Sequence, residues 1–178
     1  MQSFWAHGYE STSMADLVEA TGLHKGSIYQ AFGNKHQLFI AALKAYLDGM
    51  LAQKNEALKA ADSPLDGIRS VLHTMLEIAD DDAACPRGCM ALNALVELNP
   101  HDPEVRQLLE SFMTRTRESM VEVVRQAQDA GQVSRSRPAE LITMMMMTFM
   151  SGLAAQLKGP LTKPEAHQLL DAQLEMVT

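Results

Sequence analysis

Apolar side chains return every three or four residues along most of this chain, which is the spacing that places them on one face of an α-helix. The clearest stripe lies within residues 38–51, and a nearly all-apolar stretch follows Pro138. No strand–turn–strand signal and no internal repeat is present. The pattern predicts about nine helices: a short one before Gly8, and others at residues 13–20, 24–32, 34–61, 63–78, 87–98, 102–130, 138–157 and 162–177.

Capping residues mark the ends of these predicted helices. Ser13 with Asp16 three residues later forms a capping pair, and Gly22 tolerates the left-handed conformation that ends a helix. Asp102 followed by Pro103 combines an N-cap with a proline suited to the first helical turn. These signals act over a few residues, so the boundaries are readable from the sequence alone.

Composition supports an all-α fold. Ala, Leu and Met, which includes 13 methionines, far outnumber Val and Ile, and the first group favours helices over strands. Apolar residues make up 47% and charged residues 21%, as in an ordinary globular protein. No apolar run has the length of a membrane helix, and no secretory signal is visible. Two cysteines do not make a disulfide framework, so we expect a cytoplasmic protein with no membrane partner.

The net charge of −7 excludes a uniformly basic nucleic-acid coat but not a local DNA-reading surface. Such a surface is indicated by two short helices, 13–20 and 24–32, joined by a tight turn at Gly22. Their apolar residues are spaced to bury the inner faces of two crossing helices, which is the helix-turn-helix pattern. The second helix of that pattern enters the major groove and presents its N-terminal residues to base edges.

The pattern predicts particular DNA contacts. Thr12, with a free hydroxyl, and Lys35, at the start of the next helix, are placed to touch phosphates. The remaining predicted contacts lie on the second helix and are His24, Lys25, Gly26, Ser27, Tyr29 and Gln30. The alternative for each is an ordinary exposed helix face.

The segment HGYESTSMADLVEATGLHKGSIYQAFGNKHQLFIAAL resembles the DNA-binding signature of the TetR/AcrR family of bacterial transcription regulators. A bare helix-turn-helix is weak evidence, but a string of about 35 residues is specific. The matching positions are Gly8-Tyr9, Thr12-Ser13, Leu17-Val18, Gly22-Leu23, Lys25-Gly26-Ser27-Ile28-Tyr29, Phe32, Lys35 and Leu38-Phe39. The segment RGCMALNALVELNPHDPEV is also similar to one of the family's C-terminal types.

The resemblance implies a three-helix DNA-binding head over residues 1–46 and a ligand-binding and dimerisation domain over residues 47–178. It implies a ligand-responsive repressor that acts as a homodimer on double-stranded DNA, with an unknown small-molecule effector. Two recognition helices about one DNA turn apart (~34–36 Å) would read a near-palindromic operator. The alternative is a helical sensor or interaction module with weakened DNA binding.

Three features depart from the family pattern. Family members usually carry His or an aromatic residue at the position of Gln30, and Ser or Ala at that of His24, and we expect these changes to alter the preferred DNA sequence. The first helix is short, because only residues 1–7 precede Gly8, and we expect that an N-terminal segment is omitted; a half-length helix is the alternative. Residues 1–50 hold three lysines against four acidic residues, a balance that a missing basic arm would repair.

The second domain offers candidate effector contacts. Methionine adapts its shape, so the methionine cluster of residues 144–150 suits a pocket for apolar ligands, although plain core packing is the alternative. Asn93 lies in an apolar run where an unpaired amide is costly, and His73, Glu97 and Arg117 are further polar candidates that also suit surface or capping positions. The predicted effector contacts are Met75, Met90, Asn93, Phe112, Thr116, Met144 and Met147.

The resemblance implies that the last two helices pack against their counterparts in a second subunit as a four-helix bundle. The predicted interface residues are Met146, Met150, Leu153, Leu169, Leu170, Leu174 and Val177.

The sequence gives little indication of redox sensing, metal binding or catalysis. Cys85 and Cys89 are four residues apart and would suit a redox or electrophile sensor, but Pro86 argues against one helix through both. No metal-ligand spacing, nucleophile–base pattern or phosphate loop is present, so we expect no metal, no cofactor and no enzymatic activity.

Overall fold

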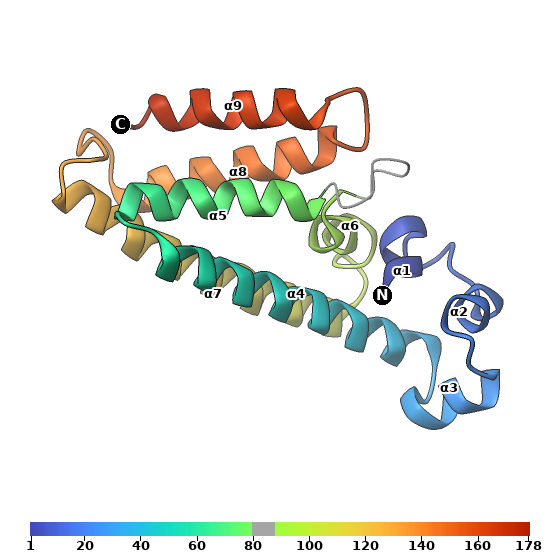
Figure 1. The fold of residues 1–178 in the computed structure, drawn as a ribbon. Coiled ribbons are helices and arrows are strands. Elements are labelled where there is room, and N and C mark those ends of the chain that lie inside the picture. The colour runs from blue at the N-terminus through green and yellow to red at the C-terminus, as the bar shows by residue number, and fades with distance from the viewer. Residues whose placement is uncertain (80–87) are drawn as a thin grey trace.

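The computed structural model describes residues 1–79 and 88–178, and within them it contains nine helices and no strand (Figure 1). The predicted all-α fold is confirmed. The helices are α1 (Gln2–His7), α2 (Met14–Thr21), α3 (Lys25–Phe32), α4 (Lys35–Ala60), α5 (Pro64–Ala79), α6 (Met90–Glu97), α7 (Pro103–Asp129), α8 (Ala139–Gln156) and α9 (Lys163–Glu175). None of them is long and apolar enough to cross a membrane.

The predicted caps form. Ser13 and Asp16 make a reciprocal capping box at α2, and Thr162 makes one with Glu165 at α9. The Asp102 carboxylate accepts hydrogen bonds from the first amides of α7. One boundary differs, because α6 begins at Met90 rather than at residue 87, and the charged break predicted at residues 80–86 and Arg87 itself lie outside the described residues.

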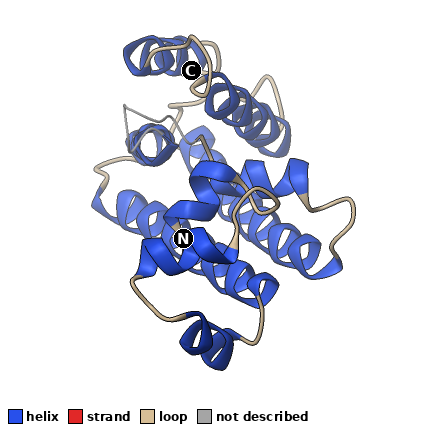
Figure 2. Cartoon of the chain, turned by 90° about the vertical axis from the view of Figure 1, so that its right-hand side faces the viewer, coloured by secondary structure: helices blue, strands red, loops and turns tan. Residues whose placement is uncertain are grey.

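The three short helices form a head at one end of the molecule, and the longer helices form a body (Figure 1). Within the body α4 and α7 lie along one side, with α5, α8 and α9 stacked above them. α4 belongs to both parts, since it runs without a break through residue 46, the expected domain boundary. Figure 2 shows the same helices after a quarter turn, joined by loops.

Two clusters of buried side chains hold the fold. The first lies in the body, where α5, α7, α8 and α9 meet. The second joins the head to α6 and to the start of α7, so head and body share one core. Its buried members include Phe4, Trp5, Leu17, Ile28 and Phe39 from the head side, and Met90, Ala94, Leu98, Val105 and Leu109 from the body side.

Contacts with the rest of the fold stabilise the first helix, although it is short. Six residues are too few for a stable isolated helix. In the folded chain, the Phe4 ring meets the Phe39 ring edge-on at 5.2 Å, and the Trp5 ring meets the Tyr46 ring at 5.1 Å. Both α1 aromatics are buried against α4, so α1 is held by non-local contacts.

Candidate DNA-reading head and effector cavity

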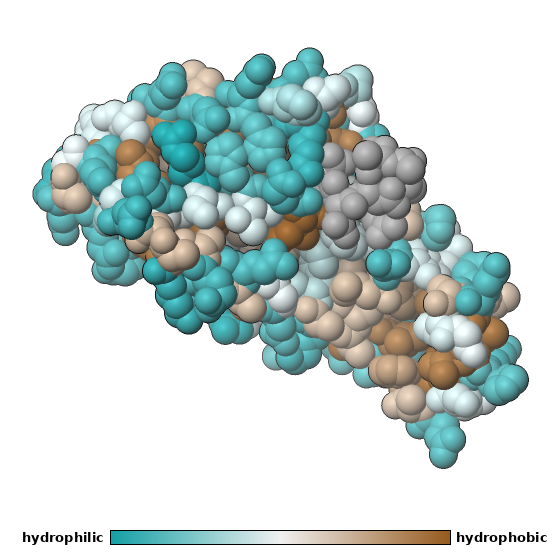
Figure 3. Space-filling view, in the orientation of Figure 1, coloured by the Kyte–Doolittle hydropathy of each residue, from teal (hydrophilic) through white to brown (hydrophobic). Residues whose placement is uncertain are grey.

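α3 presents the surface expected of a recognition helix. Ile28 is buried and anchors the helix to the head, while the predicted contacts His24, Lys25, Gly26, Ser27, Tyr29 and Gln30 are all exposed. The Lys25 ammonium lies 5.7 Å from the centre of the Tyr29 ring on that face. Figure 3 shows apolar surface on the head, whereas the visible surface over α5 and α9 is mostly hydrophilic.

Packing against the described residues does not require a glycine at position 26. It lies in the first turn of α3 with ordinary helical φ, and a Cβ placed there would meet no atom within 4 Å. Glycine in a helix is less favourable than alanine by up to about 1 kcal/mol. A residue that weakens its own helix while facing open space suits the close approach of an external backbone, such as that of DNA.

The structure corrects the prediction for Thr12. Its side chain is fully buried, and its hydroxyl donates to the Gly8 carbonyl at 2.6 Å, with the Ser3 carbonyl 3.3 Å away. The hydroxyl is therefore not free to contact phosphate; it ties α1 to the turn that precedes α2. The prediction was wrong because α1 and the nearby turn supply carbonyl acceptors for this hydroxyl. The position of Thr12 ahead of a helix gives no sign of these acceptors in the sequence.

Lys35 is half-buried beside the same turn. Its ammonium lies 4.4 Å from the centre of the Tyr9 ring and donates to the Glu10 carbonyl at 3.4 Å. These contacts fix the position of a positive charge at the head, and a phosphate contact through it stays a prediction.

Glu97, the last residue of α6, holds the head to the body. Its carboxylate accepts hydrogen bonds from the backbone amides of Tyr9 at 3.0 Å and of Glu10 at 2.8 Å. The neighbouring Gly8 has φ +81°, and a Cβ on it would lie 2.9 Å from Glu97 Oε2. Gly8 is thus required both for its backbone conformation and for the approach of the carboxylate.

Two further contacts cross between head and body. The Trp5 indole Nε1 donates to the Gly88 carbonyl at 2.8 Å. His36 Nε2 lies 2.5 Å from the Asp102 carboxylate at the start of α7. Burial raises the pKa of Asp102, but the amide of Val105 and the His36 ring outweigh it, and the pKa stands below its ordinary value.

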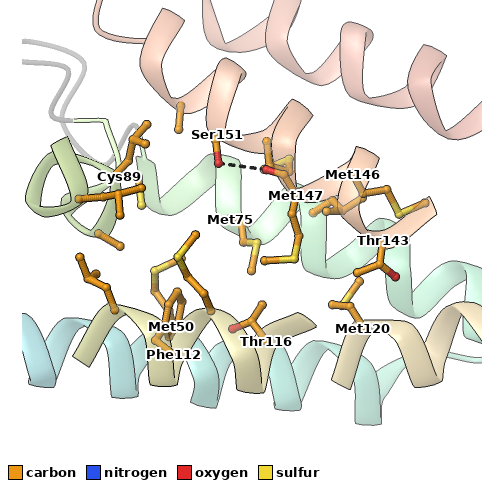
Figure 4. A pocket seen from close by; sticks show the side chains of 18 of the residues that line it. Met50, Met75, Cys89, Phe112, Thr116, Met120, Thr143, Met146, Met147 and Ser151 are labelled. Carbon is orange, nitrogen blue, oxygen red and sulfur yellow. Dashed lines mark hydrogen bonds between the residues drawn. The ribbon is translucent and has the colours of Figure 1, made fainter. Parts of the chain in front are cut away.

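A cavity of about 130 Å³ lies between α4, α5, α6, α7 and α8 (Figure 4). Of the predicted effector contacts, Met75, Phe112, Thr116 and Met147 line it. The other three do not: Met90 is buried beneath the head, Asn93 accepts a hydrogen bond from the Lys158 ammonium at 3.1 Å, and Met144 is 54% exposed. The sequence missed several lining residues, among them Met50, Met120 and Thr143, because burial alone does not tell a cavity wall from plain core.

Tyr46 and Cys89 face each other at one end of the cavity. The Tyr46 hydroxyl lies 3.6 Å from Cys89 Sγ, and burial raises the pKa of Tyr46 far above its ordinary value, so the hydroxyl stays protonated. Cys85 lies outside the described residues, so the structure does not test the alternative of a redox-sensing cysteine pair. Within residues 1–79 and 88–178, no three His, Cys, Asp or Glu side chains gather as a metal site requires.

Comparison with known families identifies this arrangement. Residues 64–168 match the family model for the tetracyclin repressor-like C-terminal domain, and residues 1–42 match that for bacterial regulatory proteins of the tetR family. The chain belongs to the TetR family. It is a DNA-binding transcription regulator with an N-terminal helix-turn-helix and a helical C-terminal domain.

Its relatives in this family are moderately similar. The uncharacterized HTH-type transcriptional regulator YezE of Bacillus subtilis is 30% identical over 134 residues, which are 75% of this chain and 69% of that protein. The HTH-type transcriptional repressor ComR of Escherichia coli is 30% identical over 133 residues, which are 75% of this chain and 63% of that repressor.

The fold agrees with solved TetR-family structures. A cysteine mutant of the regulator CifR, complexed with 26 bp of double-strand operator DNA, matches with a TM-score of 0.79 and 25% identity over 99% of this chain and 91% of CifR. A TetR-family regulator from Agrobacterium tumefaciens has a TM-score of 0.89 at 18% identity, over 99% of this chain and 92% of its own, which shows the shared fold.

The structure corrects the interface residues predicted for this TetR-family chain. Of the seven, only Leu169 is exposed, at 44%; the chain's own core buries the other six, which are Met146, Met150, Leu153, Leu170, Leu174 and Val177. Those six belong to the buried cluster of the body, to which α5 and α7 also contribute. The large apolar side chains that α8 and α9 leave exposed are Leu141, Met144, Met145 and Leu169, with Met176 directly after α9.

Proposed function

We propose that this TetR-family regulator is a repressor that binds a near-palindromic operator as a homodimer, and that a small molecule in the cavity weakens this binding. A regulator of chromosomal DNA works in the cytoplasm. The observation that carries the proposal is the double role of α6. Its residues Ala91, Leu92 and Leu95 line the cavity, and Glu97 at its end binds the head.

α6 gives the cavity a mechanical route to the head. A ligand that displaces the cavity wall moves the carboxylate that holds the amides of Tyr9 and Glu10. The head then loses a contact that sets its position on the body. A ligand changes DNA binding only if its affinity differs between the two positions of the head. Bound DNA then lowers the affinity for the ligand by the same factor.

The homodimer rests on two kinds of support. Exposed methionine and leucine side chains on one pair of helices are typical of an interaction surface, and α8 and α9 carry five of them through Met176. In addition, one recognition helix of eight residues reads only a half-site, and two copies related by a two-fold axis read a palindrome. Several relatives are named as transcriptional repressors, which supports repression over activation.

Selection from random duplex DNA at two salt concentrations tests the proposal. We expect an enriched palindrome whose binding weakens steeply as salt rises, because phosphate contacts release counterions. Replacing Lys25 and Tyr29 with alanine should weaken binding to the selected DNA and reduce the salt slope. The matched control is Lys59→Ala, since Lys59 is exposed on α4 and pairs with its helix neighbour Glu56. Failure to enrich any sequence at either salt would favour the interaction module over the repressor.

A further inference from the structure

The cavity lining that the structure describes carries no charged side chain. Among the described residues that line it, none is Asp, Glu, Lys, Arg or His, and most are aliphatic, methionine or aromatic. An ionised ligand would have to leave water for a site with no opposite charge to pair with it, which is strongly unfavourable. The lining therefore favours an uncharged molecule.

Two hydroxyls in the lining have no hydrogen-bond partner among the residues that the structure describes. Thr116 on α7 is 3% exposed and Thr143 on α8 is 1% exposed, and the Oγ1 atom of each is buried without a partner. Ser151, also in the lining, shows the usual alternative, because its hydroxyl donates to the Met147 carbonyl one turn back at 3.0 Å (Figure 4).

An unsatisfied buried hydroxyl destabilises a protein, so most are paired. The two threonines come from opposite walls, and rotation about one torsion of each moves the hydroxyl along the wall (Figure 4). Neutral hydrogen-bonding groups on a ligand would satisfy them.

The size and shape of the cavity limit which ligands it can hold. The cavity of about 130 Å³ is close to the engineered apolar cavity of about 150 Å³ that holds benzene in another protein. Methionines supply much of its wall and come from four helices: Met50, Met75, Met113, Met120, Met146, Met147 and Met150. Flexible thioether side chains adapt to small differences in shape and make favourable contacts with aromatic rings.

We propose that the effector is an uncharged, single-ring molecule, mainly apolar, that carries a hydroxyl or carbonyl group for Thr116 and Thr143. This inference rests on the proposed function in taking the cavity as the effector site. The ring fills the methionine-lined space, and the oxygen-bearing group pairs with the threonine hydroxyls. A carboxylate of the same shape does not fit this class, because the described lining offers no cation to pair with it.

Three matched probes at pH 7 test the class: p-cresol, toluene and 4-methylbenzoate. Their binding is followed by the NMR signals of ¹³C-methyl methionine, because the lining methionines report on the cavity and the exposed Met144 and Met176 serve as internal references. We expect p-cresol to shift the lining methionines and to bind about tenfold more tightly than toluene, as the hydroxyl gains hydrogen bonds. We expect 4-methylbenzoate to leave the lining signals unchanged.

The double variant Thr116→Val plus Thr143→Val isolates the hydroxyls, because valine keeps the side-chain shape. The variant should fold, since it removes two unpaired polar atoms. We expect it to lose about tenfold in affinity for p-cresol and none for toluene. Ser151→Ala is the control and should leave both affinities unchanged, because that hydroxyl is already paired.

Three results would overturn the proposed ligand class. They are binding of 4-methylbenzoate as tight as that of p-cresol, a preference for p-cresol over toluene that survives the double variant, and no shift of the lining methionine signals with any probe. Operator binding, measured in parallel, separates this inference from the proposed function. If p-cresol binds through the threonines without changing operator affinity, the ligand class stands and the coupling fails. If instead a charged molecule occupies the cavity and releases DNA, the coupling stands and the class is wrong.

Discussion

The contact between Glu97 and the head gives the sharpest test of how the two parts are joined. Glu97→Ala removes both acceptors from the Tyr9 and Glu10 amides. A hydrogen bond to a charged group contributes about 1.5–3 kcal/mol when buried, and the half-exposed position of Glu97 lowers this to about 1 kcal/mol each. The two bonds together are worth about 2 kcal/mol, which is roughly a 30-fold change in an opening equilibrium.

Amide hydrogen exchange measures this change directly. We expect the Tyr9 and Glu10 amides to lose about 30-fold in protection in Glu97→Ala. In Glu97→Gln, which keeps one acceptor oxygen and loses about 1 kcal/mol, we expect about a fivefold loss. The control is Glu118→Gln, an exposed position on α7. If Glu97→Ala leaves both amides as protected as before, Glu97 does not hold the head, and the route proposed from the cavity to DNA is refuted.

Gly8→Ala perturbs the same contact from the opposite side. The new Cβ would lie 2.9 Å from Glu97 Oε2 at a backbone φ of +81°, so both the contact and the backbone are strained. We expect the same two amides to lose protection. Agreement between Gly8→Ala and Glu97→Ala would show that one contact is responsible, whereas an effect of Gly8→Ala on α2 alone would indicate local strain only.

Two further predictions concern DNA reading and pH. Gly26→Ala should stabilise the chain by up to about 1 kcal/mol in thermal unfolding yet weaken operator binding, and a variant that binds DNA as well as the parent would contradict the close approach inferred at Gly26. The pKa of Asp102 is lowered in the folded chain, so its stabilisation is present above the ordinary value of about 3.9 and is lost as pH falls through the lower folded value. In urea unfolding, the stability difference between the parent and Asp102→Asn should therefore be largest near neutral pH and shrink below about pH 4; a difference independent of pH would show that the charge of Asp102 is unimportant.

Signals between residues close in the sequence determined the helix boundaries and the DNA-reading head of this protein. The caps at Ser13, Asp102 and Thr162 form as their sequence neighbours indicate, because a cap involves residues only two or three positions apart. The exposed face of α3 follows in the same way from the position of Ile28 in a short amphipathic helix. The family signature is made of such local features, and for that reason the DNA-reading head was recognisable without a structure.

Only the tertiary structure showed which side chains join the head to the body and which side chains of α8 are buried. Glu97 meets Tyr9 across 88 positions of sequence, and no pattern along the chain pairs them. On α8, Met144 is 54% exposed and Met146 only 2%, yet both belong to one run of methionines. A helix that is apolar all round gives no amphipathic signal, so its facing is set by the helices that pack on it. The cavity and the outer face of α8 are consequences of that packing, and the sequence predicted their residues least well.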